Sequence, residues 1–549
     1  MQSRMSPVSL TRVPIWLWIW AGLVGVMLLL RPALPVDETR YLAVAWEMWW
    51  RESIAVPYLN GAYYDGKPPL FFWLMQLGWW AFGVNEWWPR SLAPLFGLGA
   101  LLLVRAIAGR LWPNHAVRET APLILLGSFY WAVFCASTMF DMLLGFFALV
   151  SVYAVIRAWQ DSDARYFILA GLALGGGILA KGPVVFLPAL FIVLCAPWWG
   201  GQSRMERLTW RAWYGGALGA AGISALVALA WLVPMAVGSD VTYLKNMTVQ
   251  QTAGYVSESF SHRRPIWWYL PLLPLLLFPW SFWPRAWLAL GAVKTRSGDP
   301  GLRLCAVWAV TVLMAFSLIS GKQAHYPLLM FPAVALLLAR LLPEAERGRN
   351  GSLIVPAIAL IAVGALFISA GRGIVPRGMA AWLDQMPLHV WYLAGAGLIG
   401  IGFATALARR SVLNTRIAVL AAASCAMVLV LVGGVMRASW PAYDMRPAGA
   451  YLSHLESRGA PLAIAASYDG QFNFYGRIKV RVEKITAAAA ESWALAHPDG
   501  YIIALYTAEH WPLAAEAVPA FQSIYRSGGM AIWRAQDITQ HPQLPQTFR

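Results

Sequence analysis

Residues 14–30 read PIWLWIWAGLVGVMLLL, and this run contains no charged side chain. An α-helix needs about 20 apolar residues, with a lower limit near 17, to cross the hydrocarbon core of a bilayer. The run meets that limit, so we predict that it spans a membrane. Because no small-residue cleavage site follows it, we expect it to remain in the protein as an anchor.

The rest of the chain has the same apolar character. Of its 549 residues, 59% are apolar and 12% are charged, which is about half the charged fraction of a soluble globular protein. This composition excludes a soluble enzyme, a disordered chain and a collagen-like fibre. The formal net charge is +16, but the basic residues lie between apolar runs, whereas nucleic acid binding needs them on one soluble face. The composition therefore predicts a polytopic, mostly α-helical membrane protein that binds no nucleic acid.

Further apolar runs between charged breaks predict the other membrane-spanning helices. They lie near residues 88–104, 119–136, 141–157, 166–180, 183–199, 212–236, 267–290, 304–320, 326–342, 352–371, 389–408 and 417–436. The run at 70–82 is too short to span, so we predict an interfacial or re-entrant helix within a first outer loop at 31–87. The sequence therefore predicts about 13 spans.

The distribution of basic residues predicts the orientation of the bundle. Arginines are concentrated in alternate loops, for example at 105–118, 204–211 and 409–416, and the N-terminus is also basic. The positive-inside rule places these loops and the N-terminus in the cytoplasm. Because the predicted number of spans is odd, we expect the C-terminus on the opposite side, in the periplasm or its equivalent.

The composition becomes that of a soluble domain from about residue 437. Patterning predicts strands at 462–468, 472–482, 500–506 and 524–534, and helices at 445–459, 492–497 and near 507–518. We therefore expect a membrane domain at 1–436 and a small α/β periplasmic domain at 437–549.

Ionisable residues gather in short segments on the predicted outer face. They are Asp37, Glu38, Lys67, Asp141, Lys181, His262, Arg263, Arg264, Lys322 and His325, with Tyr326 beside them. Charges at a membrane boundary are costly, which favours a function for them. A carboxylate can deprotonate an acceptor hydroxyl, and cations can stabilise a departing phosphate. The set therefore predicts group transfer from a lipid-phosphate donor.

Taken singly, several of these residues also fit a structural role. Asp37 and Asp141 suit the start of a helix. Lys181 and Lys322 suit anchors that reach the interface, and the basic segment 262–264 suits a lipid headgroup contact. The joint placement of all of them at one surface is what favours a site.

Six segments together resemble the GT-C glycosyltransferases, and more closely the bacterial branch of lipid A aminoarabinose transferases and protein O-mannosyltransferase-like proteins (glycosyltransferase family 39-like). They are DETRY at 37–41, LNGxxYxxKPP at 59–69, FDM at 140–142, LAKGPV at 179–184, HRxP at 262–265 and GKxxxYP at 321–327. The resemblance implies a helical bundle with interfacial helices and an outer α/β domain. It also implies inverting transfer of a sugar from a polyprenyl-phosphate donor to lipid A, another envelope glycan or a protein.

The same motifs imply roles for individual residues. Asp37 is expected to be the general base, with Glu38 beside it and Asp141 at the family's second acidic position. The residues expected to contact the donor phosphate are Lys67, Lys181, Arg263 or Arg264, and Tyr326.

One position departs from the aminoarabinose transferase pattern. That branch commonly carries Glu before Lys-Pro-Pro, joined by a His at a metal position, whereas this chain has Gly66. Asp65 and His262 are the remaining candidate ligands for a divalent metal.

Two other classes of protein compete with a glycosyltransferase. A transporter or flippase of lipid-linked sugar would favour internal repeats and ionisable groups near the bilayer midplane, but the two halves show no repeat and the charges lie at the surface. A scaffold would leave Asp37, Lys67 and Asp141 unexplained. The sequence therefore favours the transferase.

Overall fold

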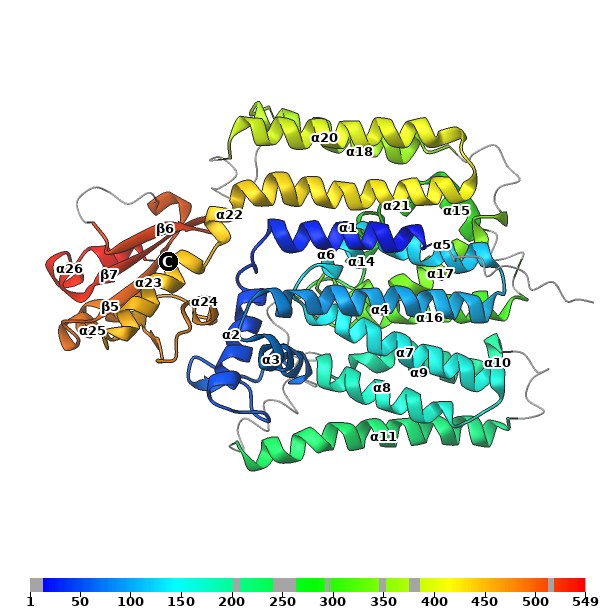
Figure 1. Cartoon of the computed structure of the whole chain (residues 1–549), viewed down its shortest axis with the longest axis horizontal. Coiled ribbons are helices and arrows are strands. Elements are labelled where there is room, and N and C mark those ends of the chain that lie inside the picture. The colour runs from blue at the N-terminus through cyan, green and yellow to red at the C-terminus, as the bar shows by residue number, and fades with distance from the viewer. Residues whose placement is uncertain are drawn as a thin grey trace, which may run out of the picture.

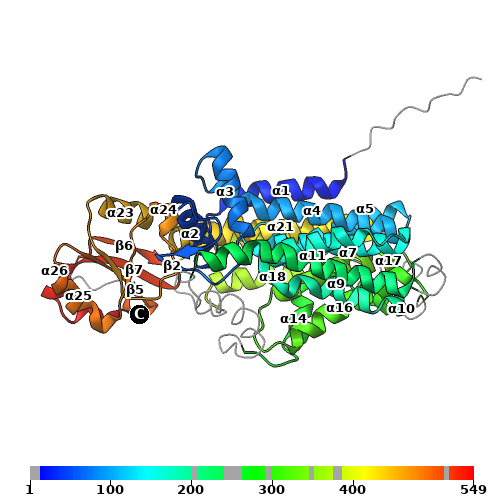
Figure 2. The ribbon, with the colours of Figure 1, turned by 90° about the horizontal axis from the view of Figure 1, so that it is seen from below.

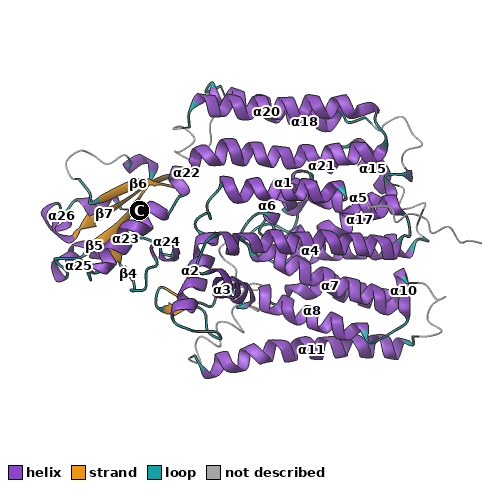
Figure 3. Ribbon diagram, viewed as in Figure 1, coloured by secondary structure: helices purple, strands orange, loops and turns teal. Residues whose placement is uncertain are grey.

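The computed structural model describes residues 13–200, 208–239, 263–291, 296, 298–344, 352–374, 386–511 and 518–548. These residues form a helical bundle with a smaller α/β domain at one end (Figure 1). Within the described part, the strands lie in that domain, apart from one short hairpin beside it (Figure 3). The predicted fold class, a mostly α-helical membrane bundle with a small C-terminal α/β domain, is confirmed.

Seven helices within the described ranges are long and apolar enough to cross a membrane. They are α4 (Trp87–Leu111), α7 (Phe140–Asp161), α11 (Trp210–Val237), α16 (Pro300–Leu318), α18 (Ile354–Gly371), α20 (Leu388–Leu407) and α21 (Leu413–Val430). The protein is therefore a multi-pass membrane protein.

The other runs predicted to span are shorter helices or helices in two pieces. They are α1 (Ile15–Leu30), α5 (His115–Leu126) with α6 (Phe129–Cys135), α8 (Tyr166–Lys181), α9 (Phe186–Leu194) with α10 (Ala196–Trp199), α14 (Tyr269–Leu276) with α15 (Pro284–Gly291), and α17 (Phe331–Leu341). Each predicted run is thus helical, but the count of 13 crossings stays a prediction.

The exposed face of helix α11 is apolar, which indicates that lipid rather than water surrounds the bundle. Leu218, Leu226 and Val237 on this helix are 74%, 67% and 85% exposed. A soluble protein would place polar side chains on such a face, whereas a helix that is apolar all round suits lipid.

The first outer loop packs between the bundle and the C-terminal domain (Figures 1 and 2). It consists of α2 (Asp37–Trp50), the hairpin β1 (Tyr58–Leu59) with β2 (Ala62–Tyr63), and α3 (Leu70–Phe82). Helix α3 has the bounds predicted for the short non-spanning helix. An aromatic cluster joins α2 to the start of α7, with the rings of Tyr41 and Phe140 4.8 Å apart and edge to face. This cluster fixes the acidic start of α2 relative to the membrane helices.

The C-terminal domain is built on a five-stranded sheet with the order β4-β3-β5-β7-β6. Its strands are β3 (Leu462–Ile464), β4 (Glu483–Lys484), β5 (Tyr501–Tyr506), β6 (Phe521–Tyr525) and β7 (Gly528–Arg534). β3 pairs in parallel with β4 and β5, whereas β7 is antiparallel to β5 and β6. Helices α23 (Arg446–Ser457), α25 (Ala490–Ala496) and α26 (Ala535–Gln540) complete the domain. Separate apolar clusters, one containing Ile464 and the other Ala463, show that both sheet faces are covered.

Two strand predictions in this domain are wrong. Residues 472–482 form the short helix α24 (Asn473–Gly476) and a loop rather than a strand. Their alternating apolar residues are buried within the domain and against the first outer loop instead of in a ladder. The run at 524–534 is a hairpin, because the chain reverses at Arg526, which has a φ of 52°. Of the helix predicted near 507–518, residues 508–510 form a 3₁₀ turn and 512–517 lie outside the described residues.

The membrane bundle and the soluble domain are joined by continuous helix. α21 passes through a π-helical turn at Leu431–Met436 into α22 (Arg437–Tyr443). The boundary that we propose between residues 436 and 437 therefore falls within a helical stretch.

Candidate active site

A cavity of about 640 Å³ lies among the start of α2, the N-terminus of α7, the C-terminus of α8 and the 3₁₀ helix η5 (Tyr326–Met330). Its polar lining consists of Asp37, Arg40, Tyr41, Lys67, Asp141, Lys181, Gln323, His325 and Tyr326. Five of the residues predicted for the site, Asp37, Lys67, Asp141, Lys181 and Tyr326, are therefore brought together. Deeper walls are apolar and come from membrane helices, for example Leu149 on α7 and Trp308 on α16.

Asp141 and Lys181 form an ion pair in this cavity. Lys181 Nζ lies 2.7 Å from Asp141 Oδ1, and their side chains are 14% and 6% exposed. Asp141 is in the first turn of α7, and Lys181 is the last residue of α8. Each charge therefore complements the dipole of its own helix. Gly182, with a φ of 83°, ends α8 and turns the chain away after the lysine.

His325 and Tyr326 approach the same ion pair from the hairpin between α16 and α17. His325 Nε2 lies 3.9 Å from Asp141 Oδ1, and Lys181 Nζ lies 5.6 Å from the centre of the Tyr326 ring. Burial is the main cause that lowers the pKa of His325 to about 4, so its imidazole is neutral at pH 7. The cationic partner of Asp141 is therefore Lys181.

Asp37 lies at the mouth of the cavity and contacts Arg40. Arg40 Nη2 donates to Asp37 Oδ1 one helical turn away, and the Asp37 side chain is 52% exposed. The second guanidinium nitrogen, Nη1, lies 3.3 Å from Asp469 Oδ1 in the C-terminal domain. A carboxylate at this place remains accessible to a substrate.

Lys67 stands on the loop before α3, where Pro68 and Pro69 restrict the backbone. Burial, followed by the charge of Lys181, lowers the pKa of Lys67 to about 8. An anion bound beside Lys67 would stabilise its protonated form in this apolar-walled cavity, so the lysine is suited to pair with a phosphate.

Glu38 does not line the cavity, unlike its neighbour Asp37. Its two carboxylate oxygens accept two hydrogen bonds of 2.9 Å from Arg31, and they also accept from the backbone N–H groups of Leu34 and Thr138. Glu38 and Arg31 are 4% and 3% exposed. These contacts indicate that Glu38 holds the start of α2 against α7. They do not leave its carboxylate placed to take a proton from a substrate.

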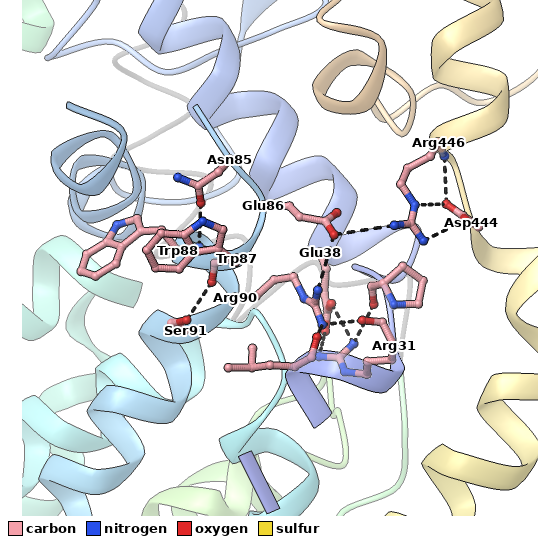
Figure 4. A network of polar contacts seen from close by, with 12 residues as sticks. Arg31, Glu38, Asn85, Glu86, Trp87, Trp88, Arg90, Ser91, Asp444 and Arg446 are labelled. Atoms are coloured by element: carbon pink, nitrogen blue, oxygen red, sulfur yellow. Dashed lines mark hydrogen bonds and ion pairs between the residues drawn. The ribbon is translucent and has the colours of Figure 1, made fainter. Parts of the chain in front are cut away.

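The Arg31–Glu38 pair belongs to a polar network that reaches the C-terminal domain (Figure 4). Arg90 on α4 donates to the backbone oxygen of Arg31 and lies 3.6 Å from Glu86. Glu86 in turn lies 3.8 Å from Arg446, which pairs with Asp444 at 2.8 Å. The network connects the helix that carries Asp37 to the start of the soluble domain.

Three other basic residues predicted for the outer face lie beside the cavity rather than on its lining. Arg263 and Arg264 are exposed, and their segment pairs with the backbone at Ser320 and Gly321. Lys322 is buried and donates to the carbonyls of Arg264 and Ile319. In this structure Lys322 therefore joins two loops, and donor contacts by Arg263 or Arg264 stay predictions.

The metal site predicted from Asp65 and His262 also stays a prediction. His262 lies outside the described residues. Within the described ranges, no group of three or more His, Cys, Asp or Glu side chains is placed to hold a metal ion. Asp65 is not among the cavity-lining residues.

Four polar residues on the lining were not assigned a role from the sequence: Arg40, Tyr41, Gln323 and His325. Arg40 lies three residues after Asp37 on one helix, so the spacing placed both on the same face. His325 directly precedes Tyr326 in the same short hairpin, so its position in the sequence could have indicated that it belongs to the site. The sequence did not indicate the contact between Asp469 and Arg40, because only the tertiary fold brings the two residues together.

Comparisons with known proteins agree with this architecture. Residues 66–244 match the family described as dolichyl-phosphate-mannose-protein mannosyltransferase. The undecaprenyl phosphate-alpha-4-amino-4-deoxy-L-arabinose arabinosyl transferase of Edwardsiella ictaluri (strain 93-146) is 29% identical over 375 residues, which are 66% of this chain and 63% of that protein. The protein of the same name from Yersinia pestis (strain Pestoides F) is 28% identical over 73% of this chain and 72% of its own length. In the first of these matches, the chain spans less than two thirds of the relative.

A solved structure gives the same fold. The crystal structure of ArnT from Cupriavidus metallidurans in the apo state matches with a TM-score of 0.72 and 19% identity, over 95% of this chain and 98% of that chain. The chain is thus a polytopic membrane protein that has the fold of this ArnT structure. Its sequence is similar to the aminoarabinose transferases and, over residues 66–244, to the mannosyltransferase family, so the resemblance predicted from the motifs is confirmed.

Proposed function

We propose that the chain is an inverting glycosyltransferase that moves a sugar from a polyprenyl-phosphate donor to an envelope acceptor. The observation that carries the proposal is the cavity, in which the carboxylate of Asp37 and the cations Lys67 and Lys181 share one lining above an apolar wall. Such a cavity offers a proton acceptor, a phosphate site and a surface for a lipid chain in one place.

The reaction follows from these groups. The Asp37 carboxylate accepts the proton of an acceptor hydroxyl, and the resulting nucleophilic oxygen attacks the anomeric carbon of the donor sugar. The new carbon–oxygen bond forms as the bond from that carbon to the phosphate oxygen breaks on the opposite face. The products are the glycosylated acceptor with inverted configuration, the polyprenyl phosphate and a protonated Asp37.

Lys67 and Lys181 are the cations proposed to receive the charge of the departing phosphate. Both line the cavity, and fixed cations in a dry site stabilise charge that develops in the transition state. Asp141 holds the Lys181 ammonium in place through the 2.7 Å contact. A buried ammonium without such a partner would be strongly unfavourable.

The apolar wall of the cavity suits the polyprenyl chain of the donor. Leu144 and Leu149 from α7 and Trp308 from α16 are among its lining residues, and α7 and α16 are both long enough to span a membrane. Burying a lipid chain there removes apolar surface from water, and the phosphate would stay at the charged end.

The names of related proteins suggest which donor to test first. The relatives from Edwardsiella and Yersinia are named as transferases of 4-amino-4-deoxy-L-arabinose from undecaprenyl phosphate, and a second structure of ArnT from Cupriavidus metallidurans is described as bound to undecaprenyl phosphate. We propose an undecaprenyl-phosphate-linked sugar as the donor. Lipid A is the first acceptor to test, followed by other envelope glycans and proteins. The proposed location is the bacterial inner membrane, with the N-terminus in the cytoplasm and the cavity facing the periplasm.

The test is mass spectrometry of lipid A, lipid-linked sugars and envelope proteins from three strains: wild type, a deletion strain and a strain carrying Asp37→Asn. Loss of one sugar mass from a single acceptor in both mutants would support the proposal and identify the acceptor. Unchanged acceptors in both mutants would contradict it, and an assay of lipid-linked sugar flipping would then test the transporter alternative.

A further inference from the structure

Arg40 stands between two carboxylates that come from opposite ends of the chain. Its Nη2 donates to Asp37 Oδ1 and its Nη1 lies 3.3 Å from Asp469 Oδ1. The side chains of Arg40, Asp37 and Asp469 are 25%, 52% and 38% exposed. Arg40 and Asp37 line the cavity, whereas Asp469 does not. Asp469 can therefore influence the site through Arg40 and not by touching a substrate in the cavity.

The loop that carries Asp469 is packed closely onto the first outer loop. Gly470 has a φ of 72°, and a Cβ atom built on it would lie 2.5 Å from Leu59 Cδ1 and 3.0 Å from Ala43 Cβ. The buried side chain of Gln471 accepts a hydrogen bond of 2.9 Å from the Asp469 backbone N–H. Close approach at a glycine and a local side-chain bond together fix the position of Asp469.

Further contacts hold the two segments in register around this loop. Asn60 donates to the carbonyl of Val482 and accepts from its N–H, both at 2.8 Å. Trp46 Nε1 donates to the Ile478 carbonyl at 3.1 Å. These bonds join α2 and the β1–β2 turn to the C-terminal domain, so the Asp469–Arg40 contact rests on a specific interface.

We propose that Asp469 is a positioning residue for the transfer reaction, and this inference rests on the proposed function. Asp469 engages one nitrogen of the Arg40 guanidinium, so that Arg40 contacts Asp37 through a single nitrogen. Guanidinium groups prefer two parallel bonds to one carboxylate. Without Asp469, Arg40 turns both nitrogens to Asp37, occupies both of its oxygens, and hinders proton transfer from the acceptor hydroxyl.

The experiment compares transfer rates of the purified full-length chain in lipid nanodiscs, with undecaprenyl-phosphate-linked aminoarabinose as donor and lipid A as acceptor. Asp469→Asn should lower kcat about fivefold, the size that an exposed charge pair can supply, and leave the KM for the donor unchanged. Asp469→Glu should recover most of kcat, because it restores the charge. Asp499→Asn is the matched control, since Asp499 is an exposed aspartate of the same domain, and it should stay within twofold of wild type.

A second arm separates positioning from a structural role. In an Arg40→Ala background, Asp469→Asn should add no further loss of kcat, because residues that act through one another are not additive. A further loss in that background, or a loss in which the thermal midpoint falls and Asp469→Glu gives no recovery, would overturn the inference.

Failure of the inference can be told from failure of the proposed function. If wild type transfers sugar and Asp37→Asn does not, but Asp469→Asn behaves like Asp499→Asn, the inference is wrong and the function stands. If Asp37→Asn is as active as wild type, the proposed function is wrong, and the positioning role falls with it.

Discussion

Lys181 Nζ lies 2.7 Å from Asp141 Oδ1, and His325 Nε2 approaches the same oxygen at 3.9 Å. The other oxygen, Asp141 Oδ2, is buried and accepts no hydrogen bond from the residues that the structure describes. Buried acceptors of this kind are normally satisfied. We therefore expect a hydroxyl or amine of a bound substrate to donate to Asp141 Oδ2.

Breaking the Asp141–Lys181 pair from one side should destabilise the protein. Asp141→Leu leaves a buried ammonium, and Lys181→Met leaves a buried carboxylate, each at a cost of about 3–5 kcal/mol. Both single variants should lower the midpoint of thermal unfolding in detergent. The double variant should recover much of the loss but remain inactive, and a double variant less stable than either single one would refute this account.

Asp37→Asn should reduce kcat by about 10²–10⁴-fold, the usual contribution of a general base. Binding of undecaprenyl phosphate should change little, because Lys67 and Lys181 remain. Calorimetric titration and a transfer assay on the same preparation measure the two quantities.

Glu38→Gln is the contrasting variant for Asp37→Asn. It removes the buried charge that pairs with Arg31, so it should lower the thermal midpoint while the folded fraction keeps kcat within a few-fold. The assignment of the base to Asp37 would be wrong if Glu38→Gln abolished turnover without loss of stability.

Donor affinity should fall as the pH rises from 7 to 9. Burial lowers the pKa of Lys67 to about 8, so the protonated, phosphate-binding form is the majority at pH 7 and the minority at pH 9. The KM for the donor should rise over this interval in wild type and stay flat in Lys67→Arg, since arginine remains charged. A wild-type KM that is flat across the interval would show that Lys67 does not bind the phosphate through its charge.

Gly470→Ala should loosen the C-terminal domain from the first outer loop. Alanine at a positive φ costs about 1–2 kcal/mol, and the clash with Leu59 and Ala43 adds about 1–3 kcal/mol. Gly459→Ala is the matched control, because Gly459 has a φ of 69° with open space around its Cβ position. Gly470→Ala should therefore lower both kcat and the thermal midpoint more than Gly459→Ala, and equal effects would argue against the packing role.

The membrane bundle could be predicted from sequence because lipid leaves a strong signal. A span needs a long run without charge, and runs such as the one that forms α11 cannot be mistaken for polar segments. The short run of α3 was separated from the spans by its length, and also because a span there would have placed the basic N-terminus opposite the basic loops. The strand predicted at 472–482 failed because its alternating apolar residues, among them Phe474, pack partly against Trp79 of α3, with ring centres 5.5 Å apart. Alternating apolar residues indicate that side chains are buried, but they do not show that the backbone forms the hydrogen bonds of a β-sheet.

The candidate site, too, could be predicted only in part from the sequence. Asp37, Lys67, Asp141, Lys181 and Tyr326 could be gathered from motifs and from a shared membrane surface. The sequence could not show that Glu38 pairs with Arg31 while its neighbour Asp37 lines the cavity. That difference depends on which face of α2 each residue lies on. Asp469 lies 429 residues from Arg40 in the chain, and no local pattern predicts a contact at that distance.

The loop at Gly470 packs against the first outer loop, and this contact has a consequence for biosynthesis. Synthesis runs from the N-terminus, so the segment with Asp37 and Lys67 leaves the ribosome long before the segment with Asp469. A nascent chain whose translation has reached only the last membrane helix holds a proton acceptor and its cations but not the domain that completes their surroundings. Maturation of the proposed transferase is therefore expected to end when the C-terminal domain has been synthesised and has folded. Chains truncated before residue 469 should insert into the membrane without acquiring full turnover.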